Sequence, residues 1–412
     1  DYSAAYWNPA GLAGQGNMVM VEGKFINPMI WLTTDMPDYT YYEGYSNGVE
    51  QTTRAANFPA GSFGLTYQYN PRWTFALSAF APTAIGVDWE GLYLGPPHGY
   101  NPNTDYPTNA WYSDLKVFDV HPSFGYRMND NVRFGAGLAL QYSDITLRSP
   151  TWSPTGAPVP YDHVYIVGEM AGTGFGVGMN LGFMFDFEDK FNLGISWRSP
   201  TYLNINGGLK QDIYGASNDA LYAATSNPVF TGATFSAEPD AEATLPIPQD
   251  LGVGLAWKVN PMFTLAMDFF WTNWSSVDDV KINVDGQDPF GQEADDTEIL
   301  LYYEDVIRFN VGFDVMPMEG FHILGGYYYD PTAIPERSLR PSITDVNNKH
   351  NISGGLSYEV SDFVIQGYWE HLWSPERETE LKDANSDGEM DNVAGTWKMQ
   401  VDTFGLTIGY KF

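Results

Sequence analysis

The sequence of 412 residues lacks cysteine, is poor in basic residues and has no long apolar run. Without cysteine, neither a disulfide framework nor a thiolate metal site can form. Only 20 Lys and Arg stand against 51 Asp and Glu, a net charge of −31, so no nucleic acid is expected as a partner, because phosphate binding requires clustered basic side chains. No run approaches the ~18 apolar residues of a transmembrane helix. The chain is therefore either soluble or crosses a membrane as β-strands.

What the sequence does contain is alternation with a period of two, which places successive side chains on opposite faces of a strand. At the C-terminus, Phe, Leu, Ile, Tyr and Phe at the even positions of 404–412 alternate with Thr, Gly, Thr, Gly and Lys. The same division recurs in 191–198 and 307–315. A soluble β-sandwich would expose charged or Thr-rich faces. Here the second face is mostly small or polar, so we predict a membrane barrel with its apolar face toward lipid.

We count fourteen candidate strands, and the connections between them alternate between short and long. The short connections are turn-forming pairs such as Asn70-Pro71 and Asn260-Pro261. This pattern predicts an all-β fold, a 14-stranded antiparallel transmembrane β-barrel with both termini on the periplasmic, short-turn side. The predicted strands are 17–33, 61–69, 72–89, 112–127, 131–148, 173–187, 190–206, 248–259, 261–275, 304–316, 319–330, 347–359, 361–374 and 396–412. The predicted long connections include 34–60, 90–111, 207–247 and 375–395.

Two glycine motifs are assigned to structure and not to chemistry. Residues 44–48 match the G-x-S-x-G nucleophile elbow, but no helical pattern follows them, so no enzyme activity is predicted. Gly172, Gly174, Gly176 and Gly178 share one strand face because their period is two. We expect these glycines to make room inside the barrel for a plug, since a dinucleotide site would require a following helix.

One acidic loop resembles a calcium-binding loop. Oxygen-bearing side chains stand at its positions 1, 3, 5 and 9, a backbone carbonyl would serve at position 7, and Gly388 occupies position 6, but position 12 is Ala394 instead of Glu. Calcium in this loop and a solvated acidic loop tip are therefore alternatives. No cofactor is expected to be required. The candidate ligands are Asp383, Asn385, Asp387, Glu389 and Asp391.

Arg198 and Arg308 lie on the small, polar faces of their strands and therefore point into the predicted lumen. A buried guanidinium group could bind a ligand carboxylate bidentately. The alternative is a structural ion pair with an inward acid such as Asp268 or Glu370. Arg148, near the extracellular end of its strand, is a third candidate for the carboxylate. The other ligand contacts would be apolar, because acyl chains bind through burial of surface area.

Several segments resemble the FadL/TodX family of outer-membrane transporters for long-chain fatty acids and hydrocarbons. Asn8-Pro9-Ala10-Gly11-Leu12 resembles the signature of that family's N-terminal hatch, a plug in the lumen. Trp271-Thr272-Asn273-Trp274-Ser275 and Trp197-Arg198-Ser199-Pro200 resemble two of its strands. The resemblance covers nearly the whole chain. It implies a hatch at residues 1–16, incomplete at its start, and a barrel with long extracellular loops at residues 17–412.

The resemblance also implies passive diffusion of cargo into the barrel and lateral release into the membrane at a kink in the third strand, beside the hatch. Independently, the third predicted strand contains Ala81, Pro82, Thr83 and Gly86. Pro82 cannot donate a ladder hydrogen bond and Gly86 weakens pairing, so we predict that the wall opens there. A bulge without a role in transport is the alternative. We expect the Asn8-Pro9 turn to hold the hatch near this kink.

The predicted function is uptake of hydrophobic compounds across the outer membrane of a Gram-negative bacterium by a multi-pass monomer. The expected partners are hydrophobic small molecules, either long-chain fatty acids or similar hydrocarbons, and outer-membrane lipid. A general porin and a surface adhesin are alternatives with the same architecture. A soluble carbohydrate-binding β-protein is the third alternative.

Overall fold

The computed structural model describes most of the chain. It describes residues 2–35, 48–54, 57–90, 92, 111–159, 161–188, 190–383 and 392–412, and only the backbone of residues 83–85 and 152. The G-x-S-x-G motif, apart from Gly48, lies outside the described residues. Within the described ranges, no helix is long and apolar enough to cross a membrane.

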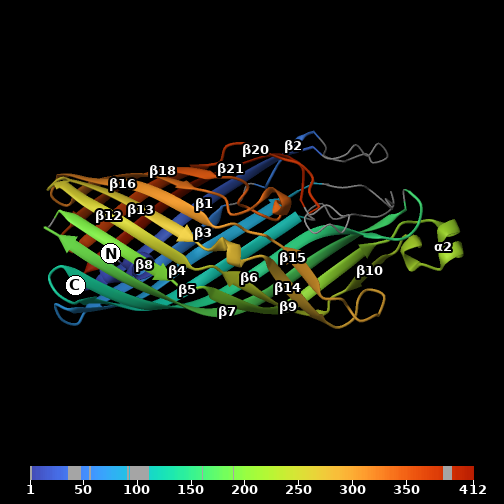
Figure 1. The fold of residues 1–412 in the computed structure, drawn as a ribbon, viewed down its shortest axis with the longest axis horizontal. Helices are drawn as coiled ribbons and strands as arrows, with labels where there is room; N and C mark the ends of the chain where they lie inside the picture. The colour runs from blue at the N-terminus through green and yellow to red at the C-terminus, as the bar shows by residue number, and fades with distance from the viewer. Residues whose placement is uncertain are drawn as a thin grey trace.

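A single antiparallel sheet curls round and closes on itself (Figure 1). β1 pairs with β21 along its whole length and with β3 on its other side, so the first and last strands join. Three of the fourteen wall strands consist of two pieces each. The predicted 14-stranded barrel is confirmed. Its wall strands are β1 (Met18–Thr34), β3 (Phe58–Gln68), β4 (Trp73–Trp89), β5 (Trp111–Arg127), β6 (Val132–Pro154), β7 (His163–Phe187), β8 (Phe191–Arg198) with β9 (Thr201–Tyr214), β12 (Asp250–Asn260) with β11 (Asp240–Ile247), β13 (Phe263–Thr272) with β14 (Asp279–Asp285), β16 (Val306–Met318), β17 (Phe321–Asp330), β18 (Lys349–Val360), β19 (Phe363–Trp373) and β21 (Gly395–Lys411).

The remaining elements are short and most of them lie in the long connections. The first two precede β1, and the others lie in the connections between wall strands. They are α1 (Ala4–Trp7), the 3-10 helix η1 (Pro9–Leu12), β2 (Glu50–Thr52), α2 (Asp219–Thr225), η2 (Pro228–Phe230), β10 (Thr234–Ala237), η3 (Trp274–Ser276), β15 (Thr297–Leu300), η4 (Glu336–Ser338) and β20 (Arg377–Thr379).

The two faces of the wall differ as the alternation predicts. In β21, Phe404 and Leu406 point outward and are 59% and 53% exposed, whereas Thr403 and Thr407 point inward and are buried. Exposed Phe, Leu, Ile and Val side chains cover the outer face of the other strands in the same way. An outer surface of this kind is favourable against lipid and unfavourable against water.

Tight turns gather at one end of the barrel and long connections at the other (Figure 1). We call these the turn end and the loop end. Both chain termini lie toward the turn end, whereas α2 and β10 project at the loop end. Asn side chains stabilise several tight turns: Asn129, for example, accepts hydrogen bonds from the backbone N–H groups of Asn131 and Val132.

The prediction of an irregular connection over 207–247 was partly wrong. β9 continues to Tyr214, β10 follows, and β11 already begins at Asp240. β9 and β11 share with β14 a buried apolar cluster that includes Leu209, Ala241 and Ile282. Residues 240–243 alternate Asp, Ala, Glu and Ala, which gives a weak hydrophobic signal in the sequence. Contacts with neighbouring strands, which the local pattern does not contain, stabilise this strand.

Residues 2–16, which we call the N-terminal segment, pack against glycines of the inner wall. A Cβ atom on Gly135 would lie 2.1 Å from the Pro9 carbonyl carbon, and one on Gly125 would lie 2.4 Å from the backbone nitrogen of Ala13. The expectation that Gly172 to Gly178 make room for a plug was wrong. Side chains of β9, such as Ile205, occupy the space beside those glycines.

We predict that Gly135→Val lowers the free energy of unfolding by about 1–3 kcal/mol, because the added side chain overlaps the backbone of the N-terminal segment. Gly354→Val is the matched control, since a Cβ atom there meets no atom within 4 Å. Denaturant unfolding in lipid vesicles measures both. Equal stability of the two variants would contradict the packing described above.

Candidate functional site

The Asn8-Pro9-Ala10-Gly11 motif attaches the N-terminal segment to three wall strands. The Asn8 side chain caps η1, accepting from Ala10 N–H at 3.1 Å, while its Nδ2 donates to the carbonyls of Phe183 and Ile195 at 3.2 Å each. Only a side chain that both accepts and donates can do this. Pro9 opens η1, where its missing N–H costs nothing. The motif therefore lies against β6, β7 and β8, and the contact with β4 is made by other residues of the segment.

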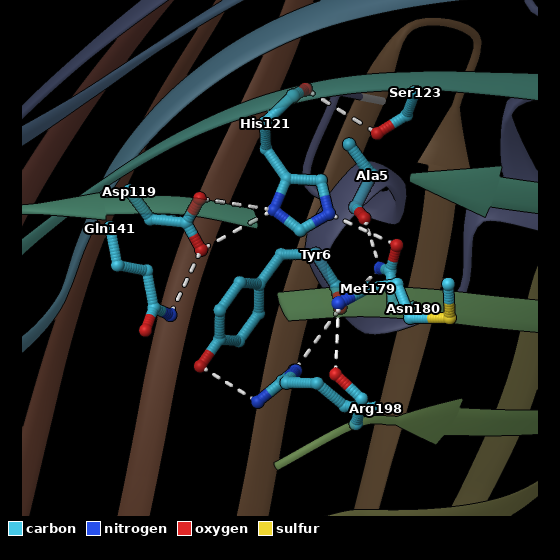
Figure 2. A network of polar contacts seen from close by, with 10 residues as sticks. Ala5, Tyr6, Asp119, His121, Ser123, Gln141, Met179, Asn180 and Arg198 are labelled. Carbon is cyan, nitrogen blue, oxygen red and sulfur yellow. Dashed lines mark hydrogen bonds and ion pairs between the residues drawn. The ribbon is translucent and has the colours of Figure 1, made fainter. Parts of the chain in front are cut away.

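A chain of buried polar contacts links the N-terminal segment to β5 and β7 (Figure 2). His121 Nδ1 faces Asp119 Oδ1 at 3.2 Å, and His121 Nε2 faces Asn180 Oδ1 at 3.0 Å. Asn180 Nδ2 in turn donates to the carbonyls of Ala5 at 2.6 Å and Tyr6 at 3.3 Å. Both imidazole nitrogens thus lie within hydrogen-bond distance of a side-chain oxygen. Because the side chains of Asp119 and His121 are 1% exposed, this is a buried acid–imidazole contact.

Arg198 holds the N-terminal segment from the other side (Figure 2). Its guanidinium group lies 3.9 Å from the centroid of the Tyr6 ring and donates to the Tyr6 hydroxyl at 3.0 Å and the Tyr6 carbonyl at 3.1 Å. It also pairs with Asp250 at 3.0 Å. The structure thus gives Arg198 intramolecular partners, and those partners are not the acids named from the sequence. Its role here is to position Tyr6.

β4 contains a β-bulge at the predicted kink. Ala81 and Pro82 together stand opposite the single residue Phe118 of β5. The extra residue reverses which side chains of β4, odd-numbered or even-numbered, point into the barrel. Before the bulge even-numbered side chains such as Ser78 are buried inside, whereas after it odd-numbered ones such as Val87 are buried.

β3 and β4 separate beside this bulge. Their pairing ends at Phe63 and Ala79, and in the described residues it does not resume toward the loop end. Residues 58–62 pair with β1 instead, on their other side. We call the unpaired stretch, residues 58–62 of β3 facing residues 80–86 of β4, the window. The predicted residues Ala81, Pro82, Thr83 and Gly86 all lie along it.

Aromatic side chains cover the window. Phe80 stacks on Tyr2 of the N-terminal segment, with 5.8 Å between ring centroids, and the Tyr2 hydroxyl is hydrogen bonded to Ser62 of β3 at 2.5 Å. Farther toward the loop end, a Cβ atom on Gly86 would lie 3.1 Å from the ring of Phe58. The edges of the window are therefore bridged by side chains, whereas backbone hydrogen bonds join β3 and β4 from Phe63 and Ala79 toward the turn end.

A cavity of about 350 Å³ lies between the N-terminal segment and the wall formed by β8, β12, β13 and β16. Trp7, Asn8, Asp268 and Phe270 are among its lining residues. Arg308 lies over the Trp7 and Phe270 rings, at 5.6 and 5.0 Å from their centroids. Its Nε is buried and has no hydrogen-bond partner among the described residues. Asp268 is near enough to interact with Arg308 electrostatically.

Residues 331–348, which we call the cap, fold into the loop end of the barrel. Ile334 and Leu339 are buried there against inward side chains of β1, β4, β5 and β21. Lys349 donates to Asp345 at 2.6 Å. Burial raises the pKa of the Asp345 carboxyl group, and attraction to Lys349 opposes the rise. A raised carboxyl pKa means that the folded state binds this proton more tightly than the unfolded state does. The contribution of Asp345 to stability therefore decreases as pH rises from the ordinary carboxyl pKa through the raised one.

The remaining predicted site residues lie apart from the window. Arg148 forms an ion pair with Glu169 in the neighbouring strand. Of the candidate calcium ligands, Asn385, Asp387, Glu389 and Asp391 lie outside the described residues, and only Asp383 is described. Calcium binding there stays a prediction. In the ranges that the structure describes, no three His, Asp or Glu side chains form a metal-binding group.

Sequence reasoning missed the Asp119–His121–Asn180 contacts and the cover formed by Tyr2 and Phe80. Asp119 and His121 are two residues apart, so a search for acid–imidazole pairs at strand spacing would have found them. Nothing local indicates Asn180 as a partner, because the contact joins residues 59 positions apart. The same holds for Tyr2 and Phe80.

We predict that His121→Leu lowers the free energy of unfolding by about 1–3 kcal/mol, because it removes the imidazole partner of the buried Asp119 carboxyl group and leaves it the long contact with Gln141 Nε2 at 3.5 Å. The double variant with Asp119→Leu should recover part of this loss. His163→Leu is the matched control: His163 also faces an aspartate, Asp162 at 3.2 Å, but both side chains are more than 20% exposed. Urea unfolding in lipid vesicles measures all four proteins, and equal losses at His121 and His163 would contradict a stabilising buried acid–imidazole contact.

Comparison with known proteins agrees with this architecture. The family model for the outer membrane protein transport protein family (OMPP1/FadL/TodX) matches residues 1–412. The outer-membrane protein NMB0088 of Neisseria meningitidis serogroup B is 22% identical over 430 aligned residues, which cover 100% of this chain and 90% of that protein. The long-chain fatty acid transport protein of Escherichia coli O6:H1 is 21% identical over 269 residues, or 61% of this chain and 57% of that protein. A solved structure of a Pseudomonas aeruginosa FadL homologue has a TM-score of 0.78 at 19% identity, covering 100% of this chain and 94% of that chain, and so shares the fold.

The family match spans the whole chain, whereas the alignment with the fatty acid transport protein covers only a little more than half of that relative. The family consists of outer-membrane transport proteins and not of enzymes. The chain therefore belongs to the OMPP1/FadL/TodX family of outer-membrane transport proteins.

Proposed function

We propose that this outer-membrane protein takes up long-chain fatty acids or similar hydrocarbons by passive diffusion into its lumen and releases them sideways into the membrane through the window. The observation that carries the proposal is the bulge at Ala81 and Pro82, beside which β3 and β4 are no longer paired. The tight-turn end would face the periplasm, with both termini there. One closed barrel contains every part of this path, so a monomer suffices.

Lateral release is favoured because the contacts that close the two possible exits differ in strength. Toward the turn end, the N-terminal segment is fixed by polar contacts of Asn8, Asn180 and Arg198, of which the contact between Asn180 and the Ala5 carbonyl is buried. At the window, by contrast, the closure consists of aromatic side chains and few hydrogen bonds. Rotating such side chains is far less costly than breaking a buried network. An apolar molecule that passes the window enters lipid, where burial of its surface is favourable.

We predict that deleting Pro82 closes the window. The deletion leaves Ala81 opposite Phe118 and keeps inward and outward faces unchanged on both sides, because it removes the one extra residue of the bulge. Uptake of labelled oleate by cells lacking their own transporter should fall by about tenfold or more, since one or two ladder hydrogen bonds would then have to break for each passage.

Pro82→Ala is the control for this deletion, because it keeps the residue count and therefore the bulge. Because the bulge and not the missing N–H of Pro82 is proposed to open the window, this variant should retain uptake close to that of the parent protein. A loss as large as that of the deletion would instead assign the opening to the missing donor. Heat-modifiable mobility on gels would verify that both variants form a barrel. Uptake through the Pro82 deletion at the parent rate would overturn lateral release at this site.

Arg308 is the best-placed residue for a carboxylate head group. Arg198 and Arg148 are already paired with Asp250 and Glu169. Arg308 holds its guanidinium against Trp7 and Phe270, two rings that line the cavity, and its Nε has no hydrogen-bond partner among the described residues. Asp268 attracts it electrostatically, but no hydrogen bond joins the two in the part of the chain that the structure describes. A guanidinium with a free N–H beside this cavity suits a molecule with one anionic end and a long apolar body.

We predict that Arg308→Gln weakens oleate binding by about tenfold or more, the equivalent of one lost charge-assisted hydrogen bond. Binding of hexadecane, an apolar chain of similar length without a carboxylate, should stay within about twofold. Fluorescence titration of the detergent-purified protein measures both. An equal loss for oleate and hexadecane would indicate that Arg308 only supports the cavity wall, and no loss for either would exclude it from the binding site.

A further inference from the structure

The window has a second closure at its end toward the loops. The backbone N–H of Arg54 donates to the carbonyl of Asp88 at 2.8 Å. Arg54 follows β2, and Thr53 is held on β1 through a hydrogen bond from its N–H to the carbonyl of Ile30 at 3.0 Å. The window is therefore bounded at both ends, by the last β3–β4 pair toward the turn end and by the Arg54–Asp88 contact toward the loop end.

The side chain of Arg54 strengthens this boundary electrostatically. Its Nη2 lies 2.8 Å from Glu90 Oε2, and its Nη1 lies 3.6 Å from Asp88 Oδ2. The three side chains are 57%, 62% and 24% exposed for Arg54, Glu90 and Asp88. Exposed ion pairs of this kind are weak, are screened by salt and reform readily. They are suited to a contact that opens and closes many times.

Both edges of the window are attached to the barrel on the side away from the window. Trp89 of β4 is almost completely buried and donates from its Nε1 to the carbonyl of Pro341 in the cap at 2.8 Å, so the loop end of β4 is anchored. On the other edge, Thr53 and residues 58–62 are bonded to β1, and Phe58 reaches across to Gly86. Widening the window at this end therefore requires the contacts of Arg54 with Asp88 and Glu90 to break.

We propose that Arg54, with Asp88 and Glu90, is an ion-pair latch that sets how often the window opens, and that release through the window therefore depends on ionic strength. Arg54 is a positioning residue in this account, because it touches the frame of the window and not the cargo. The inference rests on the proposed function, since a latch has meaning only if cargo leaves through the window.

The test compares Arg54→Gln, Arg54→Lys and the parent protein in vesicles, using the initial rate of oleate transfer at 10 mM and 500 mM NaCl. Dividing each rate by the parent rate at the same salt cancels the effect of salt on oleate itself. At low salt, Arg54→Gln should transfer oleate about 1.4 to 5 times faster than the parent protein, the range that the loss of an exposed ion pair gives. At high salt its rate should equal the parent rate. The rate of Arg54→Lys should stay near the parent rate at both salt concentrations.

Lys411→Gln is the matched control, because Lys411 forms an exposed ion pair with Glu359 at 2.6 Å near the turn end, away from the window. The transfer rate of Lys411→Gln should equal that of the parent protein at both salt concentrations. A ratio of one for Arg54→Gln at low salt, or a ratio that persists at high salt, would overturn the latch. If the Pro82 deletion also leaves transfer unchanged, release through the window is rejected. If that deletion stops transfer while Arg54→Gln has no effect, only the proposal of a latch is rejected.

Discussion

The constraint on which the rest of the structure depends is that a closed barrel has no free edge. Backbone groups in the hydrocarbon layer must be paired within the wall, so a lateral opening cannot simply be left in it. β4 meets this constraint with one extra residue at Ala81 and Pro82. The bulge lets β4 stay paired with β5 while it leaves β3, and β3 stays paired with β1. Each edge of the window thus keeps a paired neighbour on its other side, interrupted in β4 only at the bulge.

The N-terminal segment combines a rigid attachment with a flexible contact. Asn8, Asn180 and Arg198 fix its backbone through hydrogen bonds, and His121 holds the Asn180 side chain. Loss of the buried Asn180 contact would leave buried polar groups unsatisfied. At its start, Tyr2 reaches the window through ring stacking and a hydroxyl group. In the proposed function, the first part keeps the lumen closed toward the periplasm and the second part is displaced when cargo leaves.

Period-two alternation was sufficient to predict the barrel, its strand number and which face is apolar, because these depend on local pattern. Pro82 indicated the position of the bulge for the same reason, because it lacks the N–H group that a ladder requires. Gly86 lies beside the window but pairs regularly with Asp114 of β5. The partners of Arg198 and the contacts of Tyr2 could not be predicted, since they join distant parts of the chain. The strand at 240–247 was missed because alanine alternating with acids carries little hydrophobic signal, and packing between strands stabilises it instead.

The most direct test of the account is to map where cargo touches the protein. A photoactivatable fatty acid is irradiated during transfer into vesicles, and the modified peptides are identified by mass spectrometry. The account predicts adducts on both edges of the window, in residues 58–62 and 80–86. Adducts instead on Asn192 and Asn310, which line the cavity on the other side of the N-terminal segment, with none at the window, would contradict lateral release.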